Sequence, residues 1–265
     1  MSFDTQLITQ LREMTGAGIA DCKMALEEAN SDLEKAIAIL RQKGSVKAAK
    51  KAERATNEGV IAMAKDKDKV ALVGLACETD FVSQNSDFVA TVNDFAQKLL
   101  TIELAEFEKI AQEKIQNELI VKIGENIKLA FAEVITGELI GVYLHSNKKL
   151  ASALVLSGGN SELASVLAMQ ITAMSPKYVA PENIPPAEIE KEKAIYREQL
   201  KNEGKNEAMW DKIIPGKLNK YYAEVCLLNQ PFIKDDKMIV GDLIKQTAKT
   251  MGEEIKVEKF TRYQI

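Results

Sequence analysis

The chain has 265 residues, of which 46% are apolar and 28% charged, and it carries a net charge of −4 at pH 7. This composition is typical of a globular protein with a substantial core and excludes a strongly basic polyanion binder. The longest apolar run, 70–77, is too short to cross a bilayer, and the first residues lack the basic and apolar segments of a secretory signal. We therefore expect a cytoplasmic protein without a membrane segment.

The residue types that carry most covalent and metal chemistry are scarce. His145 is the only histidine, which excludes a multi-histidine metal site. The three cysteines, Cys22, Cys77 and Cys226, are far apart and form no CxxC pair, so we expect reduced, structural thiols. No phosphate-binding loop of the GxxxxGK[ST] type occurs. We predict no enzyme activity, no catalytic residue, no bound metal and no cofactor.

The N-terminal segment has helical spacing and few signs of strands. Apolar periodicity, a Gly-Ala-Gly turn at 16–18 and the S-x-x-E pattern of Ser31 and Glu34 predict three short helices over 3–43. We expect Gly44 to end the third helix. The run 43–54 holds five basic side chains, one acidic side chain and many alanines. It predicts a helical linker with solvated charges, and contact with RNA or the ribosome is the alternative.

From Gly59 onward the pattern alternates between strands and helices. Strand-like runs at 60–64 and 70–77 flank a polar turn, and the runs 127–136 and 138–145 predict a second hairpin turning near Gly137. Helical spacing returns at 86–100 and 107–123, and a strand at 150–157 precedes a helix from Ser161, its expected cap, to 174. This half of the chain predicts an α+β fold with antiparallel sheet.

A proline-rich stretch at 181–186 marks a boundary, and the residues after it, 187–228, predict two helices. The first of these helices is highly charged and has a thin apolar seam, which favours a projecting coiled-coil hairpin with Trp210 as its anchor. A helix at 240–251 and a strand at 255–263 follow, and we expect them to pack back on the sheet because they have too little apolar surface to stand alone.

Four short segments, spread over nearly the whole chain, resemble the elongation factor Ts family. They are LREMTGAGIADCK at 11–23, ETDFVSQN at 78–85, KIGENI at 122–127 and QPF at 230–232. They occur in the order and with the spacing of the family, whereas each alone is a weak signal. Ser83 and Gln84 stand where the family usually has alanine and lysine, so the contact that this lysine makes is not carried over.

The resemblance implies a division that agrees with these patterns. It implies an N-terminal three-helix domain similar to ubiquitin-associated domains, which with the basic linker occupies 1–54. A two-part core follows, with one half at 55–140 and the other at 141–180 and 229–265. The helical hairpin at 181–228 is then a coiled-coil insertion into the second half.

The resemblance also implies a function. Family members bind the GDP form of elongation factor Tu, dislodge its magnesium ion and promote GDP release so that GTP can bind. The residues that match the family's GTPase-binding segment are Thr79, Asp80, Phe81 and Val82. Phe81 is the expected wedge, with a buried core position as the alternative. A second GTPase contact is expected at Arg12, Gly18 and Ile19, and plain helix packing is the alternative there.

Three further hypotheses remain open at this point. The basic helix 43–54 could serve an RNA- or ribosome-binding accessory module, although the acidic remainder argues against nucleic acid. Glu78, expected to be a surface charge, could pair with Asp80 in an enzyme. The N-terminal domain could recognise ubiquitin-like partners, by analogy of fold alone. A homodimer or a 2:2 assembly through the coiled coil is left open, and no role is assigned to His145.

Overall fold

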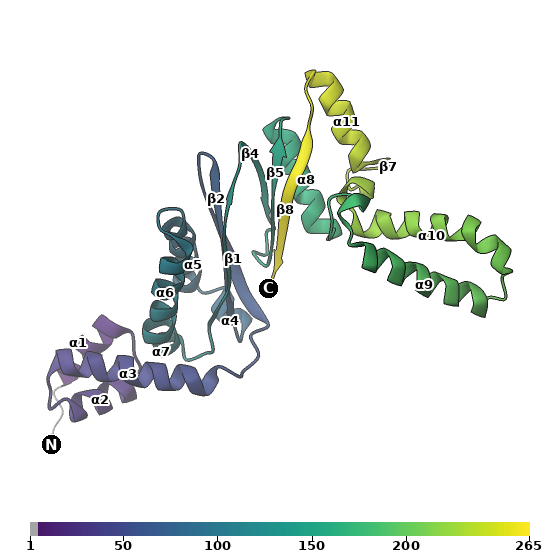
Figure 1. The fold of residues 1–265 in the computed structure, drawn as a ribbon. Helices are drawn as coiled ribbons and strands as arrows, with labels where there is room; N and C mark the ends of the chain where they lie inside the picture. The colour runs from purple at the N-terminus through teal and green to yellow at the C-terminus, as the bar shows by residue number, and fades with distance from the viewer. Residues whose placement is uncertain (1–4) are drawn as a thin grey trace. The chain divides into compact units, whose positions relative to one another are not determined.

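The computed structural model describes residues 5–265, except for the side chains of residues 45 and 47–50. The chain forms two compact units. The first extends to Ile135 and also includes residues 147–149 and Ile265, and the second contains residues 136–146 and 150–264. Both are built from helices and antiparallel sheet, so the predicted α+β class is confirmed (Figure 1). No helix in the described part of the chain is long and apolar enough to cross a membrane.

The first unit begins with the three predicted helices, α1 (Thr5–Thr15), α2 (Ile19–Glu28) and α3 (Leu33–Lys51). They enclose a small buried cluster of Leu11, Ala17, Cys22, Ala25, Leu26, Ala29, Ala36 and Leu40. The predicted Ser31 cap is wrong. Ser31 takes a positive φ of 66°, and the side chain of Asp32 instead accepts a hydrogen bond from the Lys35 N–H at 3.1 Å. Asp32 directly precedes α3 and therefore occupies the N-cap position, whereas Ser31 lies one residue further from the helix.

The expectation that Gly44 ends the third helix is also wrong, because α3 continues to Lys51. Gly44 is buried where α3 packs against a π-helical turn, Ile115–Leu119, and against α7 (Ile120–Ile123). A Cβ atom at this position would lie 2.5 Å from Val121 Cγ2 and 3.0 Å from the Gln116 carbonyl oxygen. Glycine therefore allows close helix packing here and does not terminate the helix.

The first sheet has the strand order β1-β2-β3. Strands β1 (Glu58–Asp66) and β2 (Lys69–Cys77) form the predicted hairpin, in which Asp66 pairs with Lys69, and β3 (Lys128–Thr136) lies on the other side of β2. Helix α5 (Ser86–Leu99) packs on β1 and β2, and α6 (Leu104–Lys114) packs on α5. The buried residues at their interface include Val60, Val73, Leu75, Phe88, Phe95 and Phe107.

The predicted hairpin of 127–136 with 138–145 does not form. Strand β3 joins the first sheet, whereas β4 (Leu139–Leu144) pairs with β5 (Leu150–Ser157) in the second unit. The local pattern of two strands around Gly137 was correct, but the pairing partner of a strand depends on which sheet offers it a free edge. Gly137 thus lies between strands of separate sheets.

The second sheet has the order β4-β5-β8, and β8 (Lys256–Gln264) is the predicted last strand. Helix α8 (Ser161–Met174) packs on β4 and β5. Its cap is Asn160, whose side chain accepts from the Leu163 N–H at 2.9 Å, and the predicted cap Ser161 is the first helical residue. The short hairpin of β6 (Pro231–Phe232) and β7 (Asp235–Ile239) leads into α11 (Val240–Met251).

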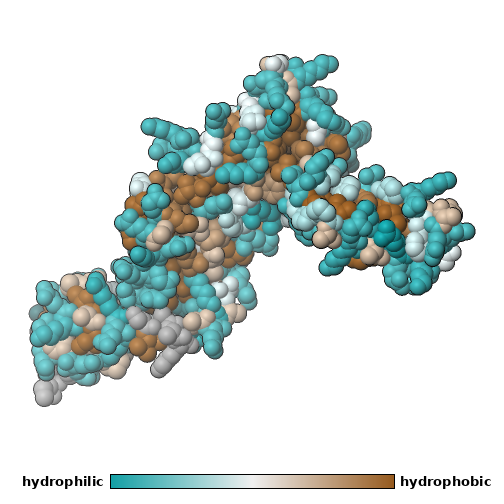
Figure 2. Space-filling model, viewed as in Figure 1, coloured by the Kyte–Doolittle hydropathy of each residue, from teal (hydrophilic) through white to brown (hydrophobic). Residues whose placement is uncertain are grey.

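The predicted helical pair is present as α9 (Pro186–Asn202) and α10 (Trp210–Val225). Short 3₁₀ turns precede and follow it at Pro181–Asn183, Glu207–Met209 and Leu227–Asn229. Leu200, Ile214 and Leu218 are buried between the helices, and Tyr196 and Trp210 pack beside them. Apolar atoms gather along this hairpin in Figure 2, as expected of a two-helix arm with a narrow seam.

The close packing at Gly44 makes a prediction about stability. Alanine is intrinsically better than glycine within a helix by about 1 kcal/mol. Overpacking a tight contact typically costs about 1–3 kcal/mol, and the collision with Val121 and Gln116 should outweigh the helical gain. We therefore expect Gly44→Ala to lower the melting temperature in thermal unfolding.

Gly216→Ala is the matched control, because Gly216 lies within α10 and a Cβ atom there meets nothing within 4 Å. This variant should gain about 0.5–1 kcal/mol. A Gly44→Ala protein that gained as much stability as Gly216→Ala would contradict the close packing of α3.

Candidate functional site

The segment Thr79-Asp80-Phe81-Val82 directly follows the first hairpin. Strand β2 ends at Cys77, and after Glu78 and Thr79 the chain turns into α4 (Asp80–Ser83), a single helical turn that precedes α5. Asp80 is exposed, and Phe81 is 85% exposed, more than any other large apolar residue recorded as exposed in the described part of the chain. The alternative that Phe81 is a core residue is therefore wrong in this structure.

The neighbours of Phe81 hold the turn in place. Val82 packs partly buried against the core under the first sheet, and Ser83 is buried with its hydroxyl donating to the Asp80 carbonyl at 3.0 Å. Thr79 occupies the N-cap position of α4, but its own side chain makes no capping hydrogen bond. The site thus presents one exposed aromatic side chain on a short turn that is anchored on its inner side.

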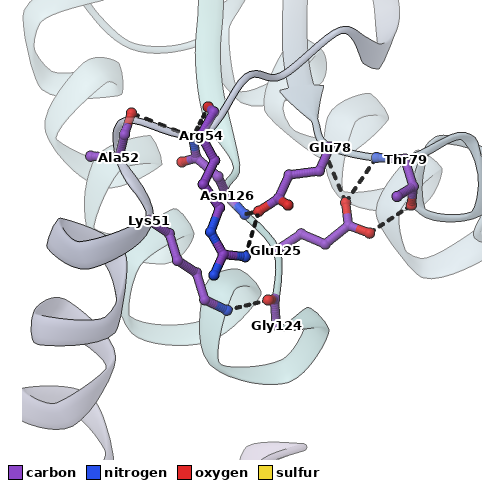
Figure 3. A network of polar contacts seen from close by, with 8 residues as sticks. All are labelled: Lys51, Ala52, Arg54, Glu78, Thr79, Gly124, Glu125 and Asn126. Atoms are coloured by element: carbon purple, nitrogen blue, oxygen red, sulfur yellow. Dashed lines mark hydrogen bonds and ion pairs between the residues drawn. The ribbon is translucent and has the colours of Figure 1, made fainter.

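The carboxylate of Glu125 binds the two residues directly before α4. Its Oε2 accepts from the backbone N–H groups of Glu78 and Thr79, each at 3.0 Å, and its Oε1 accepts from the Thr79 hydroxyl at 2.6 Å (Figure 3). Hydrogen bonds to a carboxylate are stronger than neutral ones. The KIGENI segment, whose role the sequence left undefined, therefore lies directly behind the segment 79–82.

A second set of contacts surrounds this one. Glu78, predicted to be a surface charge, is instead half-buried, and its Oε1 accepts from the Asn126 N–H at 2.6 Å and lies 3.4 Å from Arg54 Nη1. The buried Asn126 side chain donates to the Arg54 carbonyl at 2.8 Å. Glu78 is thus engaged within the chain, which argues against its pairing with Asp80 as a catalytic carboxylate.

The end of the basic run belongs to the same network. Lys51 donates to the carbonyl oxygen of Gly124, which ends α7 with a positive φ of 84° (Figure 3). A cation at this carbonyl also complements the negative end of the helix dipole. The structure therefore brings together the ends of α3, β2 and α7. The sequence contained all of these residues, but no spacing rule joins positions more than 70 residues apart.

The thiol nearest to the site is buried and chemically protected. Cys77 donates to the Thr79 carbonyl at 3.3 Å, and burial, reinforced by the carboxylates of Glu125 and Glu58, raises its pKa to about 12. Burial also raises the pKa of Cys226 to about 11 and that of Cys22 above its usual value. No group of three or more metal-ligating side chains is assembled in the part of the chain that the structure describes.

The second predicted set of residues lies at the turn between α1 and α2. Arg12 is exposed on α1, Gly18 is the N-cap of α2 with extended backbone (φ −63°, ψ 151°), and Ile19 opens the helix with 59% of its surface exposed. Met14, which belongs to the same LREMTGAGIADCK segment, is equally exposed at 59%. Two apolar side chains beside this turn are thus exposed and do not belong to the buried cluster of the three helices.

His145 follows strand β4, and its Nδ1 lies 3.2 Å from the Tyr143 hydroxyl. This contact is local to the second sheet.

Comparison with known proteins identifies the family. The family model described as elongation factor TS matches residues 78–265, and one described as a UBA-like domain matches residues 2–47. The chain belongs to the elongation factor Ts family. The second match shows that its N-terminal helices form a domain similar to ubiquitin-associated domains.

Relatives from several bacteria match along nearly their whole length. The chain is 41% identical to "Elongation factor Ts" of Hydrogenobaculum sp. over 278 residues, covering 100% of this chain and 99% of that protein. It is 39% identical to "Elongation factor Ts" of Aquifex aeolicus, covering 100% of this chain and 98% of that protein. For "Elongation factor Ts" of Clostridium botulinum, the identity is 38%, with 97% and 91% covered. The resemblance inferred from four short motifs is confirmed.

The raised pKa of Cys77 predicts that its thiol reacts slowly, although it lies close to an exposed turn. At pH 8 a thiol with a pKa of about 12 is ionised about a thousandfold less than one near 9, because three pKa units separate them. Burial restricts access further, so we expect Cys77 to resist a disulfide reagent in the native protein at pH 8. Peptide mapping after labelling measures this, with all three cysteines reacting in denaturant as the control. Rapid native labelling of Cys77 would contradict the burial.

Proposed function

We propose that the chain is a non-enzymatic nucleotide exchange factor for elongation factor Tu. In this proposal it binds the GDP-bound GTPase, places Phe81 near the nucleotide site, dislodges the magnesium ion and promotes GDP release so that GTP can bind. The observation that carries the proposal is the 85% exposed Phe81 on a turn anchored by Glu125 and Val82. Membership of the elongation factor Ts family supports the choice of partner. This partner places the proposed activity in the cytoplasm.

The physical requirement is differential binding, and no covalent step on this chain is needed. A nanomolar nucleotide complex corresponds to about 12 kcal/mol, part of which depends on a magnesium ion that demands near-octahedral geometry. An exchange protein that binds the nucleotide-free GTPase more tightly than the nucleotide-bound form weakens nucleotide binding by the same ratio of affinities. Burying one phenylalanine contributes roughly 1.5–3 kcal/mol. Phe81 is therefore a suitable wedge, and the exposed Asp80 adds a charge beside it.

The proposal assigns a second GTPase contact to Arg12, Gly18 and Ile19. Their exposure and their position at the turn between α1 and α2 support this assignment. Two contacts on one chain raise affinity because the second binds at high effective concentration. In this proposal the segment 79–82 promotes GDP release, and the contact at the turn between α1 and α2 mainly increases affinity.

The alternative of an RNA- or ribosome-binding module loses support from the basic run itself. Lys43 pairs with Glu28 at 2.6 Å, Lys51 donates to Gly124, and Arg54 lies beside Glu78. These cations have partners inside the chain. An RNA titration at two salt concentrations tests this alternative, because phosphate contacts give a steep salt dependence.

Assembly through the coiled coil also remains a proposal. The buried seam residues Leu200, Ile214 and Leu218 are used within the α9–α10 hairpin, whereas Ile195 and Met209 are 41% and 51% exposed. Sedimentation of the chain, alone and with elongation factor Tu, distinguishes a monomer from a homodimer and a 1:1 from a 2:2 complex.

Phe81→Ala should leave stability nearly unchanged and slow GDP release from elongation factor Tu. An exposed side chain loses little on truncation, whereas a core phenylalanine loses about 3–5 kcal/mol. Release of a fluorescent GDP analogue at saturating factor measures the exchange role, and thermal unfolding of the free variant measures stability. If Phe81 acts by dislodging the magnesium ion, the difference in release rate between the variant and the wild type should shrink when magnesium is chelated.

Two variants of the same unit serve as controls. Leu104→Ala removes another exposed apolar side chain, 42% exposed, and should leave exchange unchanged. Phe88→Ala removes a fully buried ring and should reduce stability strongly. Unchanged GDP release with Phe81→Ala would refute the wedge, and a deficit that persists without magnesium would place its effect in another step.

Ile19→Ser should raise the factor concentration needed for half-maximal exchange, with little change in the maximal rate. This split follows if the N-terminal domain supplies affinity. Met24→Ser is the matched control, since Met24 is 48% exposed on the same helix but lies about 140° around it from Ile19. Equal effects of the two substitutions, or none from Ile19→Ser, would remove this turn from the proposed interface.

A further inference from the structure

We propose that Glu125 is the positioning residue that sets the orientation of Phe81. Its carboxylate would fix the backbone at the start of α4 so that the exposed ring points into the partner. The inference rests on the proposed exchange function and goes beyond it, because Glu125 lies outside the segment 79–82.

The first support is the hydrogen bonding of this carboxylate. Both oxygens are used, and all three donors belong to the two residues before α4, at 3.0, 3.0 and 2.6 Å. Glu125 accepts from the N–H of Thr79, the N-cap residue, as the N3 glutamate of a capping box does, although it lies 46 residues away in the sequence.

The second support is that packing of the ring itself does not fix its direction. Helix α4 is four residues long, and so short a helix has no stability of its own. Phe81 is 85% exposed, so core packing does not determine its direction. The backbone is anchored by Val82 and the buried Ser83 after the ring and by the Glu125 carboxylate before it. Loss of the Glu125 anchor would leave the turn held only on the side of Val82 and Ser83, so that its first residues could shift.

The third support is that Glu125 is itself held on both sides. Gly124 before it accepts from Lys51, and Asn126 after it is 2% exposed and donates to the carboxylate of Glu78 and to the carbonyl of Arg54 (Figure 3). A side chain can position another residue only if its own backbone is fixed. The turn 124–126 meets this condition through partners on α3 and at the end of β2.

The test is a double-mutant cycle on exchange. Wild type, Glu125→Ala, Phe81→Ala and the double variant are compared for maximal GDP release from elongation factor Tu at saturating factor, with half-saturation and thermal unfolding measured in parallel. We expect Glu125→Ala to lower the maximal rate on the order of tenfold, the equivalent of about one charge-assisted hydrogen bond. In the Phe81→Ala background it should change the rate less than about twofold, because the group that it positions is absent.

Glu125→Gln tests whether hydrogen bonding or charge matters. An amide oxygen can accept both N–H groups, and the amide NH₂ can donate to the Thr79 hydroxyl. We therefore expect Glu125→Gln to keep most of the wild-type rate. Glu108→Ala, which removes an exposed glutamate from α6, is the control and should behave as wild type.

The outcomes separate this inference from the proposed function. Wild-type protein that fails to accelerate GDP release would overturn the proposed function. A wild-type factor that depends on Phe81 but tolerates Glu125→Ala would overturn the positioning role alone, as would additive effects in the double variant. If Glu125→Ala does not fold, Thr79→Val is the deciding variant, because it removes only the 2.6 Å hydroxyl contact. We expect Thr79→Val to fold and to release GDP more slowly. In the Phe81→Ala background, the same substitution should leave the release rate unchanged. Normal release by Thr79→Val would then overturn the inference.

Discussion

The hydrogen bonding of the turn 124–126 is the constraint on which the proposed GTPase-binding surface depends. The turn lies where α3, β2 and α7 end, and the end of each element leaves backbone groups without a partner inside that element. Glu125 accepts from the residues directly before α4, Asn126 donates to the end of the basic run, and Gly124 accepts from Lys51. The Asn126 side chain is buried, so loss of its partner would cost about 1–3 kcal/mol. The polar network thus holds this surface region in one conformation, as apolar packing does in a core.

This arrangement reconciles two demands on Phe81. A ring that must enter a partner has to be exposed in the free protein, and an exposed side chain on a short turn is ordinarily free to move. Single exposed apolar residues are common on protein surfaces. What distinguishes Phe81 is the scaffold behind it, because Val82 and the Glu125 carboxylate hold the backbone on either side of the ring. An ordered backbone reduces the conformational entropy lost on binding.

The continuous helix α3 changes how the two proposed contacts are connected. A break at Gly44 would have left the N-terminal domain on a flexible tether, whereas the helix continues to Lys51 and packs against α7. Arg54 then contacts Glu78, directly before the segment 79–82. The basic run therefore connects the two proposed contact regions through ordered structure.

The sequence by itself determined those features that depend on neighbouring residues. Helical spacing, the hairpin around 65–68, the two-helix arm and the family motifs were all correctly predicted, because periodicity and turn chemistry act over a few positions. Phe81 was assigned to a contact from its motif, and its exposure agrees with that assignment. Local patterns failed where two signals compete over one or two residues, as at the caps of α3 and α8, where Asp32 and Asn160 replaced the predicted serines.

Only the tertiary structure decided which distant segments meet. Strand β3 pairs with the edge of β2 and not with β4, its neighbour in sequence, since pairing depends on the edges that the folded core leaves free. Gly44 proved to be a packing residue because its environment comes from Val121, far along the chain. Glu125 lies 46 residues beyond Thr79, and no periodicity or spacing rule relates such positions. The support behind Phe81 therefore became visible only once folding had brought the ends of three elements to one place.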